Sequence, residues 1–423
     1  KAYDLTDPRK PKQVDEEPTH GATESMRAQT AGDRAILVSG KGVWDIRKCE
    51  DMVFKGEIPW PSVAAVVGAN IASTTQHELS ISHDARRVYT GLGFGIAYID
   101  DLDRPETWIV HNHTCEMNRQ SGFPVPGLPE PTAGLCDVAP QGEYPRQYSH
   151  SSDDHMQGSR WYGANQNGDG VSQLEPSTLR VVDISDPARI TILDSLSEVP
   201  GHSMNWWKLA DGREFTVSAN ESLTGPADTC QPHPRPTKLG NATEGYITEV
   251  TGDKLKHASL LTLKINEPQN CEAAAASGAD ATITEHSIYN KHGAAFGMFE
   301  WGGAGLRVFD LRDPYKPKEA AYFNNGAGHV HSGVFHYDDT RGIVLASASA
   351  GMQVLVLQPQ AVRALGLPYP TDPAYPFNEA SKVAGAVTDS ALPATGTATP
   401  VAGAVLAAAA LLVRALILRI RTR

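Results

Sequence analysis

One position of a repeated sequence pattern carries a histidine in five of its copies. Each of these histidines precedes a short run of alternating apolar and polar residues, as in "HSIYNKHGAAFGMFEWGG" from residue 286. Imidazole nitrogens bind copper, zinc and iron, so converging histidines could form a transition-metal site, with Glu78 or Glu285 as a carboxylate ligand. Alternatively, each histidine hydrogen-bonds to the backbone of a neighbouring repeat and has a structural role. The five are His77, His150, His202, His286 and His331.

The stretch "NQNGDGVSQLEP" at residues 165–176 partly resembles a calcium-binding loop. Asn165, Asn167 and Asp169 occupy the first, third and fifth positions, and a glycine follows where such loops turn sharply. The twelfth position holds Pro176 instead of a bidentate glutamate, and the stretch joins two predicted strands rather than two helices. The alternative interpretation is a β-hairpin with Asn-Gly and Asp-Gly turns.

Short strands and tight turns must position these residues. "VDISDPARI" (182–190) and "FDLRDPYKPK" (309–318) each end a strand with an aspartate, which can bond to the backbone two residues on in an Asx-turn. The Asp-Pro that follows blocks further strand pairing. A third clear copy is "YDLTDPRKPK" (3–12), and weaker copies lie at 44–49, 98–105, 246–253 and 354–360. About seven such units of three or four strands are typical of a β-propeller.

We therefore predict an all-β fold in which residues 1–360 form a propeller of seven blades, with six or eight blades as alternatives. The first unit contains only its last strand, and we expect its missing strands either upstream or from a C-terminal segment that closes the ring. Because the innermost strand of each blade lines the central channel, the five histidines are expected to surround one mouth of that channel.

The repeat "GLRVFDLRDPYKPKEAAYF" (305–323) and its partners resemble the LVIVD-repeat proteins, a bacterial family of β-propellers with mostly uncharacterised members. The resemblance covers roughly residues 1–360 and implies the fold without an activity. In architecture, the histidine ring is similar to that of the selenium-binding-protein and methanethiol-oxidase group, which uses copper on such a scaffold. Fold alone does not imply activity.

Charge and cysteine usage exclude some classes of protein. The formal net charge is −12 and the chain has no long basic stripe, which argues against a nucleic-acid partner. The five cysteines show no Cys-x-x-Cys spacing, so a structural zinc site is not expected. Cys115 can pair with Cys136 and Cys230 with Cys271, which leaves Cys49 over, although other connectivities are open.

The C-terminal region differs from the repeats in composition. Residues 361–391 are rich in Pro, Ala, Ser and Thr and are expected to form an extended linker. Residues 392–423 contain "LPATG", an apolar run and a basic end, an arrangement that resembles the sortase sorting signal of Gram-positive bacteria. By this resemblance, residues 401–418 enter the membrane as a hydrophobic helix, sortase cleaves after Thr395, and the propeller is displayed on the cell surface. The alternative is a simple membrane helix. The signal comprises Leu392, Pro393, Thr395 and Gly396.

These observations favour a propeller on the bacterial surface that binds or scaffolds through its loops, with a protein or cell-wall ligand as partner. The alternative is an extracellular metal-dependent oxidoreductase or hydrolase that uses the histidine ring, with copper, zinc or iron as cofactor and calcium as a minor possibility. A third interpretation is a purely structural wall protein.

Overall fold

The computed structural model describes most of the repeats and leaves out several of the connections between them. The described residues are 1–8, 10–18, 20, 26–60, 79–90, 95–113, 120, 149–156, 159–165, 178–186, 189–197, 199, 204–218, 245–263, 283–301, 304–324, 335–348, 351–372, 375 and 377. All of them belong to one unit, Lys1–Phe377.

Antiparallel sheets account for nearly all of this unit, and within each sheet the strands pair in chain order. Blade 1 contains β3 (Met26–Ala31), β4 (Arg34–Ser39), β5 (Gly42–Asp45) and β6 (Val53–Glu57). Blade 2 contains β7 (Leu79–Ile81), β8 (Arg87–Thr90), β9 (Gly95–Tyr98) and β10 (Ile109–Asn112). Blade 3 contains β11 (Ser149–Met156), β12 (Arg160–Asn165), β13 (Thr178–Asp186) and β14 (Arg189–Ser197).

Three more blades and a two-stranded sheet complete the set. Blade 4 contains β15 (Met204–Lys208), β16 (Glu214–Ser218), β17 (Gly245–Thr251) and β18 (Lys254–Leu261). Blade 5 contains β19 (Ile283–Lys291), β20 (Ala294–Trp301), β21 (Leu306–Asp310) and β22 (Lys318–Phe323). Blade 6 contains β23 (Phe335–Asp338), β24 (Ile343–Ala348) and β25 (Gly351–Val356). The N-terminal hairpin pairs β1 (Ala2–Asp4) with β2 (Lys12–Asp15).

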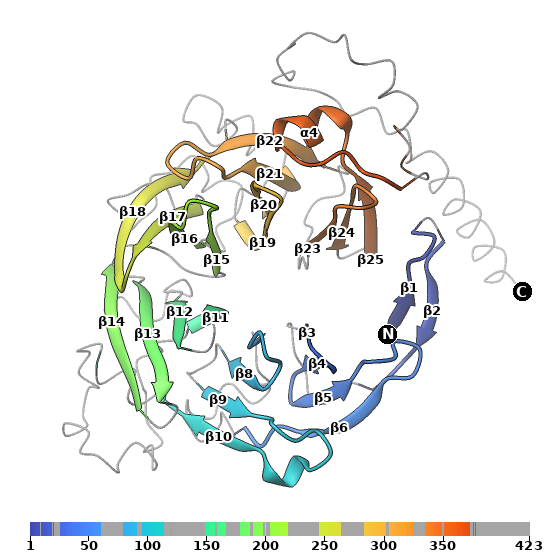
Figure 1. The fold of residues 1–423 in the computed structure, drawn as a ribbon, viewed down its shortest axis with the longest axis vertical. Coiled ribbons are helices and arrows are strands. Elements are labelled where there is room, and N and C mark those ends of the chain that lie inside the picture. Colours follow the sequence, from blue (N-terminus) through green and yellow to red (C-terminus); the bar gives the residue numbers. More distant parts are fainter. Residues whose placement is uncertain are drawn as a thin grey trace, which may run out of the picture. The chain divides into compact units, whose positions relative to one another are not determined.

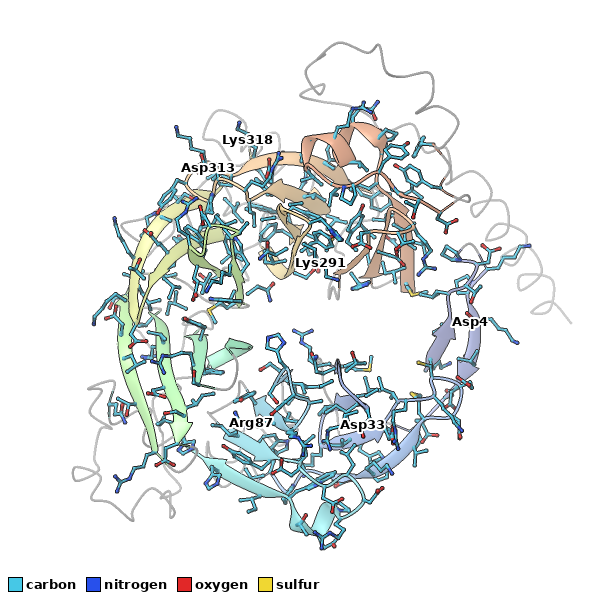
Figure 2. All side chains as sticks on the ribbon, in the orientation of Figure 1. Asp4, Asp33, Arg87, Lys291, Asp313 and Lys318 are labelled. Carbon is cyan, nitrogen blue, oxygen red and sulfur yellow. The ribbon has the colours of Figure 1, made fainter. Side chains whose placement is uncertain are left out.

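The blades follow one another around a ring, with their first strands innermost (Figure 1). These first strands contact each other in the order β3, β7, β11, β15, β19 and β23. Figure 2 shows the same arrangement in blade 5, where Lys291 at the end of β19 lies toward the middle of the ring and Lys318 at the start of β22 lies outside. The predicted all-β propeller is therefore confirmed.

The described strands form six sheets of three or four strands, which is the lower of our alternative blade counts, and seven blades are not confirmed. Helix is confined, in the same residues, to a 3-10 turn, η1 (Pro105–Thr107), and to α4 (Pro359–Ala364). No described helix is long and apolar enough to cross a membrane. The predicted terminal helix at 401–418 lies outside the described residues.

Asx-turns end the third strands, as the sequence predicts. The carboxylate of Asp4 accepts a hydrogen bond from the backbone N–H of Thr6 at 2.8 Å, and Asp310 accepts one from Arg312 at 3.0 Å. Asp45 and Asp183 make the same bond, at 3.1 Å and 2.9 Å, to the residues two positions on. This local bond turns the chain out of the third strand toward the fourth.

Apolar side chains form a core between each pair of consecutive blades. One residue pair from each core marks the series from blades 1 and 2 to blades 5 and 6: Ile36 and Val88, Tyr89 and Val182, Tyr162 and Tyr246, Phe215 and Phe309, Phe296 and Val344. Helix α4 extends the last of these cores through Val362. Each blade therefore buries apolar residues against both neighbours wherever two neighbours are described.

Three glycines let an aromatic ring lie flat on the strand beside them. A Cβ at Gly163 would lie 1.8 Å from the Cη2 atom of Trp161, which is on the same strand. Gly42 and Trp44 have the same relation at 2.3 Å, as do Gly297 and Phe299 at 2.3 Å. Because side chains two apart share a face of a strand, the ring occupies the space of the missing side chain.

We predict that Gly163→Ala destabilises the propeller by about 1–3 kcal/mol, because the new methyl group displaces the Trp161 ring from its packed position. Urea denaturation of both proteins measures the difference. In a Trp161→Leu background the same change should cost less, since the clash is gone. An equal cost in both backgrounds would contradict the explanation.

Candidate functional site

The two ends of the blades differ in how their strands are connected. First and second strands, and third and fourth strands, are joined by short turns such as 32–33, 252–253 and 292–293. Because consecutive strands are antiparallel, the remaining connections all leave from the opposite end, and they include 113–148 and 219–244. We call the two ends the turn end and the connection end. Long connections on a rigid scaffold commonly carry function, so the connection end is the candidate site.

Two of the five predicted ring histidines have a described backbone. His150 lies in β11, at a register irregularity between Ser149 and Ser151, and His286 lies in β19 opposite Phe299. Both belong to innermost strands, close to the start of the strand and hence to the connection end. Their positions agree with the predicted ring.

The metal site itself stays a prediction. His77, His202, His331 and Glu78 lie outside the described residues, and the side chains of His150, His286 and Glu285 are likewise not described. Among the side chains that the structure does describe, no group of three His, Cys, Asp or Glu residues could hold a metal ion.

The other predicted sites also lie mostly beyond the described part of the chain. Asn165 ends β12, whereas Asn167 and Asp169 are outside it, so the calcium loop stays a prediction. Cys49 is exposed and free. The remaining predicted residues outside the description are Cys115, Cys136, Cys230, Cys271, Leu392, Pro393, Thr395 and Gly396.

A buried carboxylate near the connection end was missed by sequence reasoning. Glu300 is 1% exposed and is the penultimate residue of β20, whose eight residues are all buried. It shares a strand face with Met298, which packs between blades 5 and 6. Burial of a carboxylate is costly unless it is paired, so such groups gather at functional sites. The available signal was a single acidic residue in the apolar run "AAFGMFEW".

Other buried polar residues lie at the same end of their strands. Arg180, near the start of β13, is 5% exposed, and it shares a face with Val182, which packs toward blade 2. Glu300 and Arg180 therefore belong to different blade interfaces. Smaller polar groups buried at this end are Ser39, Thr178 and Ser218. The connection end thus has a polar interior, although the centres of the blade interfaces are mostly apolar.

At the turn end, a tyrosine, a histidine and an aspartate join blades 5 and 6. The Tyr289 hydroxyl donates to Asp339 Oδ2 at 2.8 Å, and His292 Nε2 lies 3.2 Å from the same oxygen. The bond from Tyr289, followed by His292, lowers the pKa of Asp339. Burial, together with this bond, raises the pKa of Tyr289. The tyrosine therefore remains a protonated donor at neutral pH, which suits a link between blades better than a nucleophile.

The Asx-turn carboxylates at this end are held ionised by their arginine neighbours. The Arg47 guanidinium donates to both oxygens of Asp45, at 3.0 Å from Nε, and these hydrogen bonds lower the pKa of Asp45. Arg312 holds Asp310 in the same way at 2.9 Å. Asp45 is buried, so its charge depends on this partner.

We predict that Asp45 contributes stability at neutral pH and that acid removes it. Its pKa is lower in the folded state than in the unfolded chain, where it is about 4, so the contribution is present above that pH and is lost as the pH falls through the folded value. Asp45→Asn should lower the free energy of unfolding by about 1–3 kcal/mol at pH 7 and by less at pH 3, measured by urea denaturation.

Glu106→Gln is the control for this experiment, because Glu106 is exposed and should affect the free energy of unfolding little at either pH. A loss at Asp45 that is the same at pH 7 and pH 3 would exclude its charge as the cause.

Comparisons with known proteins add little beyond the fold. The chain matches no protein-family model and no curated protein. Among solved structures, a Bacteroides uniformis protein titled for 6-phosphogluconolactonase matches with TM-score 0.44 and 10% identity, over 81% of this chain and 79% of that one. The Pseudomonas aeruginosa periplasmic gluconolactonase matches with TM-score 0.42 and 12% identity, over 78% and 76%. A Lactobacillus plantarum protein matches with TM-score 0.40 and 11% identity, over 79% and 80%. Similarity this low says nothing about the activity of this chain.

Proposed function

We propose that this protein is a cell-surface β-propeller that binds a protein or cell-wall ligand at the connection end of its blades. The observation that carries the proposal is the difference between the two ends. Connections such as 58–78, 113–148 and 219–244 start and finish at one end, whereas short turns close the other. A rigid ring that gathers its variable segments on one side is suited to recognition.

The location comes from the sequence of the tail. "LPATG" at 392–396, the apolar run after it and the basic end together favour sortase anchoring to the wall of a Gram-positive bacterium. The repeats around Asp183 and Asp310 support membership of the LVIVD-repeat group. A protein held by its C-terminus outside the cell presents its blades to wall polymers and to neighbouring surface proteins.

Binding to isolated Gram-positive cell walls tests this proposal. We expect residues 1–390 to co-sediment with walls in a saturable manner, and a variant with 114–147 replaced by a Gly-Ser linker to bind at least ten-fold more weakly. The matched control is Arg104→Ala at the turn end, where the exposed Arg104 pairs only with Asp101. Absence of binding, or an equal loss in the control, would contradict a wall ligand at the connection end.

A metal-dependent hydrolase or oxidoreductase is the second candidate, and the burial of Glu300 favours it. Glu300 pairs with the start of β21 on a blade whose innermost strand carries His286. A buried carboxylate and imidazoles from the inner strands are the groups that such a site uses.

Metal analysis of residues 1–390 separates this candidate from a pure binding module. If it holds, mass spectrometry finds stoichiometric copper, zinc or iron, and the metal is lost in a His150→Ala/His286→Ala variant. Glu300→Gln should reduce the metal content or change its affinity at least ten-fold, whereas Glu106→Gln should not. A folded, metal-exposed sample without bound metal would exclude this candidate.

A further inference from the structure

Arginines at the turn end link each of several blades to the blade that follows. Arg34, after the first turn of blade 1, donates to the carbonyls of Ile99 and Asp100 in the turn between the third and fourth strands of blade 2, both at 2.9 Å. Arg160 of blade 3 donates to Asp253 in the corresponding turn of blade 4 at 2.8 Å. Arg213 of blade 4 similarly hydrogen-bonds to Tyr315 of blade 5.

Blade 6 makes the same link, but to the N-terminal hairpin. Arg341, which follows the first turn of blade 6, donates through Nη1 to the carbonyl of Leu5, in the turn between β1 and β2. Relative to blade 6, the β1–β2 hairpin therefore occupies the place of the outer two strands of a following blade.

The sequence of the hairpin agrees with this placement. Its turn reads "DPRKPK" at 7–12, and the turn between β21 and β22 reads "DPYKPK" at 313–318. Asp4 and Asp310 make the same Asx-turn. Since β21 and β22 are the third and fourth strands of blade 5, β1 and β2 correspond to third and fourth strands.

A second link places the hairpin before blade 1. Asp194 on the fourth strand of blade 3 accepts a hydrogen bond from the backbone N–H of Leu255 in blade 4 at 2.8 Å. Asp15 on β2 accepts one from the N–H of Met52 in blade 1 at 2.7 Å. Asp15 and Asp194 both stand seven residues after the proline of their turns. The hairpin thus contacts blade 1 as blade 3 contacts blade 4, and it lies between blades 6 and 1 (Figure 1).

The inner half of this position exposes apolar side chains from both flanking blades. Met26 on β3 is 49% exposed and faces away from blade 2, because Ala31 on the opposite face packs into the core of blades 1 and 2. Met352 on β25 is 43% exposed and faces away from blade 5, because Leu355 packs toward it. In the neighbouring blade 2, by contrast, all of β7 is buried.

We propose that this seventh position is an acceptor site for a β-hairpin from a partner polypeptide. The incoming second strand pairs with the open edge of β1, the only edge in the described hairpin that β2 does not cover. The first strand takes the innermost place, and apolar side chains on both faces cover Met26 and Met352. By the arginine pattern above, an arginine after its turn would reach the Trp44 and Asp45 carbonyls.

The position is occupied in this way only by a two-stranded segment with apolar residues on both faces. A single strand would pair with β1 but leave Met26 on the innermost strand uncovered. A helix is too wide, because adjacent strands are about 4.8 Å apart and a helix measures about 10 Å across. This inference is independent of ligand binding at the connection end, so either can fail without the other.

A synthetic peptide with the sequence of residues 283–301, which forms the first two strands of blade 5, is the probe. We expect saturable 1:1 binding to residues 1–390, measured by fluorescence anisotropy, and at least ten-fold weaker binding to Met26→Asp and to Met352→Asp. The matched control is Ile109→Asp, because Ile109 is 57% exposed on the outer strand of blade 2. It should bind the peptide like the parent chain.

Circular dichroism confirms that the three variants fold before binding is measured. A peptide that binds no better than its scrambled sequence would overturn the proposal, and so would equal binding by the Met26, Met352 and Ile109 variants. Failure to bind because another segment of the same chain already covers Met26 would overturn it too, and protection of β1 amides from hydrogen exchange in the free protein would identify that case.

Discussion

Contact between consecutive blades is the constraint on which the rest of the structure depends. A single four-stranded blade cannot bury both of its apolar faces, so each must pack against a neighbour. Phe215 of blade 4 needs Phe309 of blade 5, as Phe296 of blade 5 needs Val344 of blade 6. The polar links at the turn end, such as Arg34 to Ile99, then fix the angle between blades that the apolar contact alone would leave free.

Local patterns in the sequence predicted local structure well. The Asx-turns at Asp4 and Asp310 could be predicted because donor and acceptor are two residues apart. The alternating strands and the propeller followed from repetition of that unit. The blade-to-blade bonds of Arg34 and Arg160 could not be predicted, because their partners come from other repeats and depend on how the blades pack. Glu300 had a signal in sequence, but only burial shows why it matters.

The two ends of the ring divide the requirements of the fold. At the turn end, bonds such as Asp45 with Arg47 and Tyr289 with Asp339 hold short turns and neighbouring blades in place. The chain has little freedom to vary there without loss of these bonds. The connection end joins the same strands through long segments, which can change without disturbing the cores. Stability and recognition can therefore change separately in such a protein.

The aromatic rings that lie on the strands also give the interfaces distinct optical properties. Trp108 is buried between blades 1 and 2, Trp161 between blades 2 and 3, and Trp207 and Trp301 between blades 4 and 5. Indole emission shifts to longer wavelength when the ring meets water, so each buried tryptophan reports when its own interface opens. The interface between blades 5 and 6 has Tyr289 and Tyr337 instead. Intrinsic fluorescence can therefore distinguish a ring that opens at one place from a ring that unfolds as a whole.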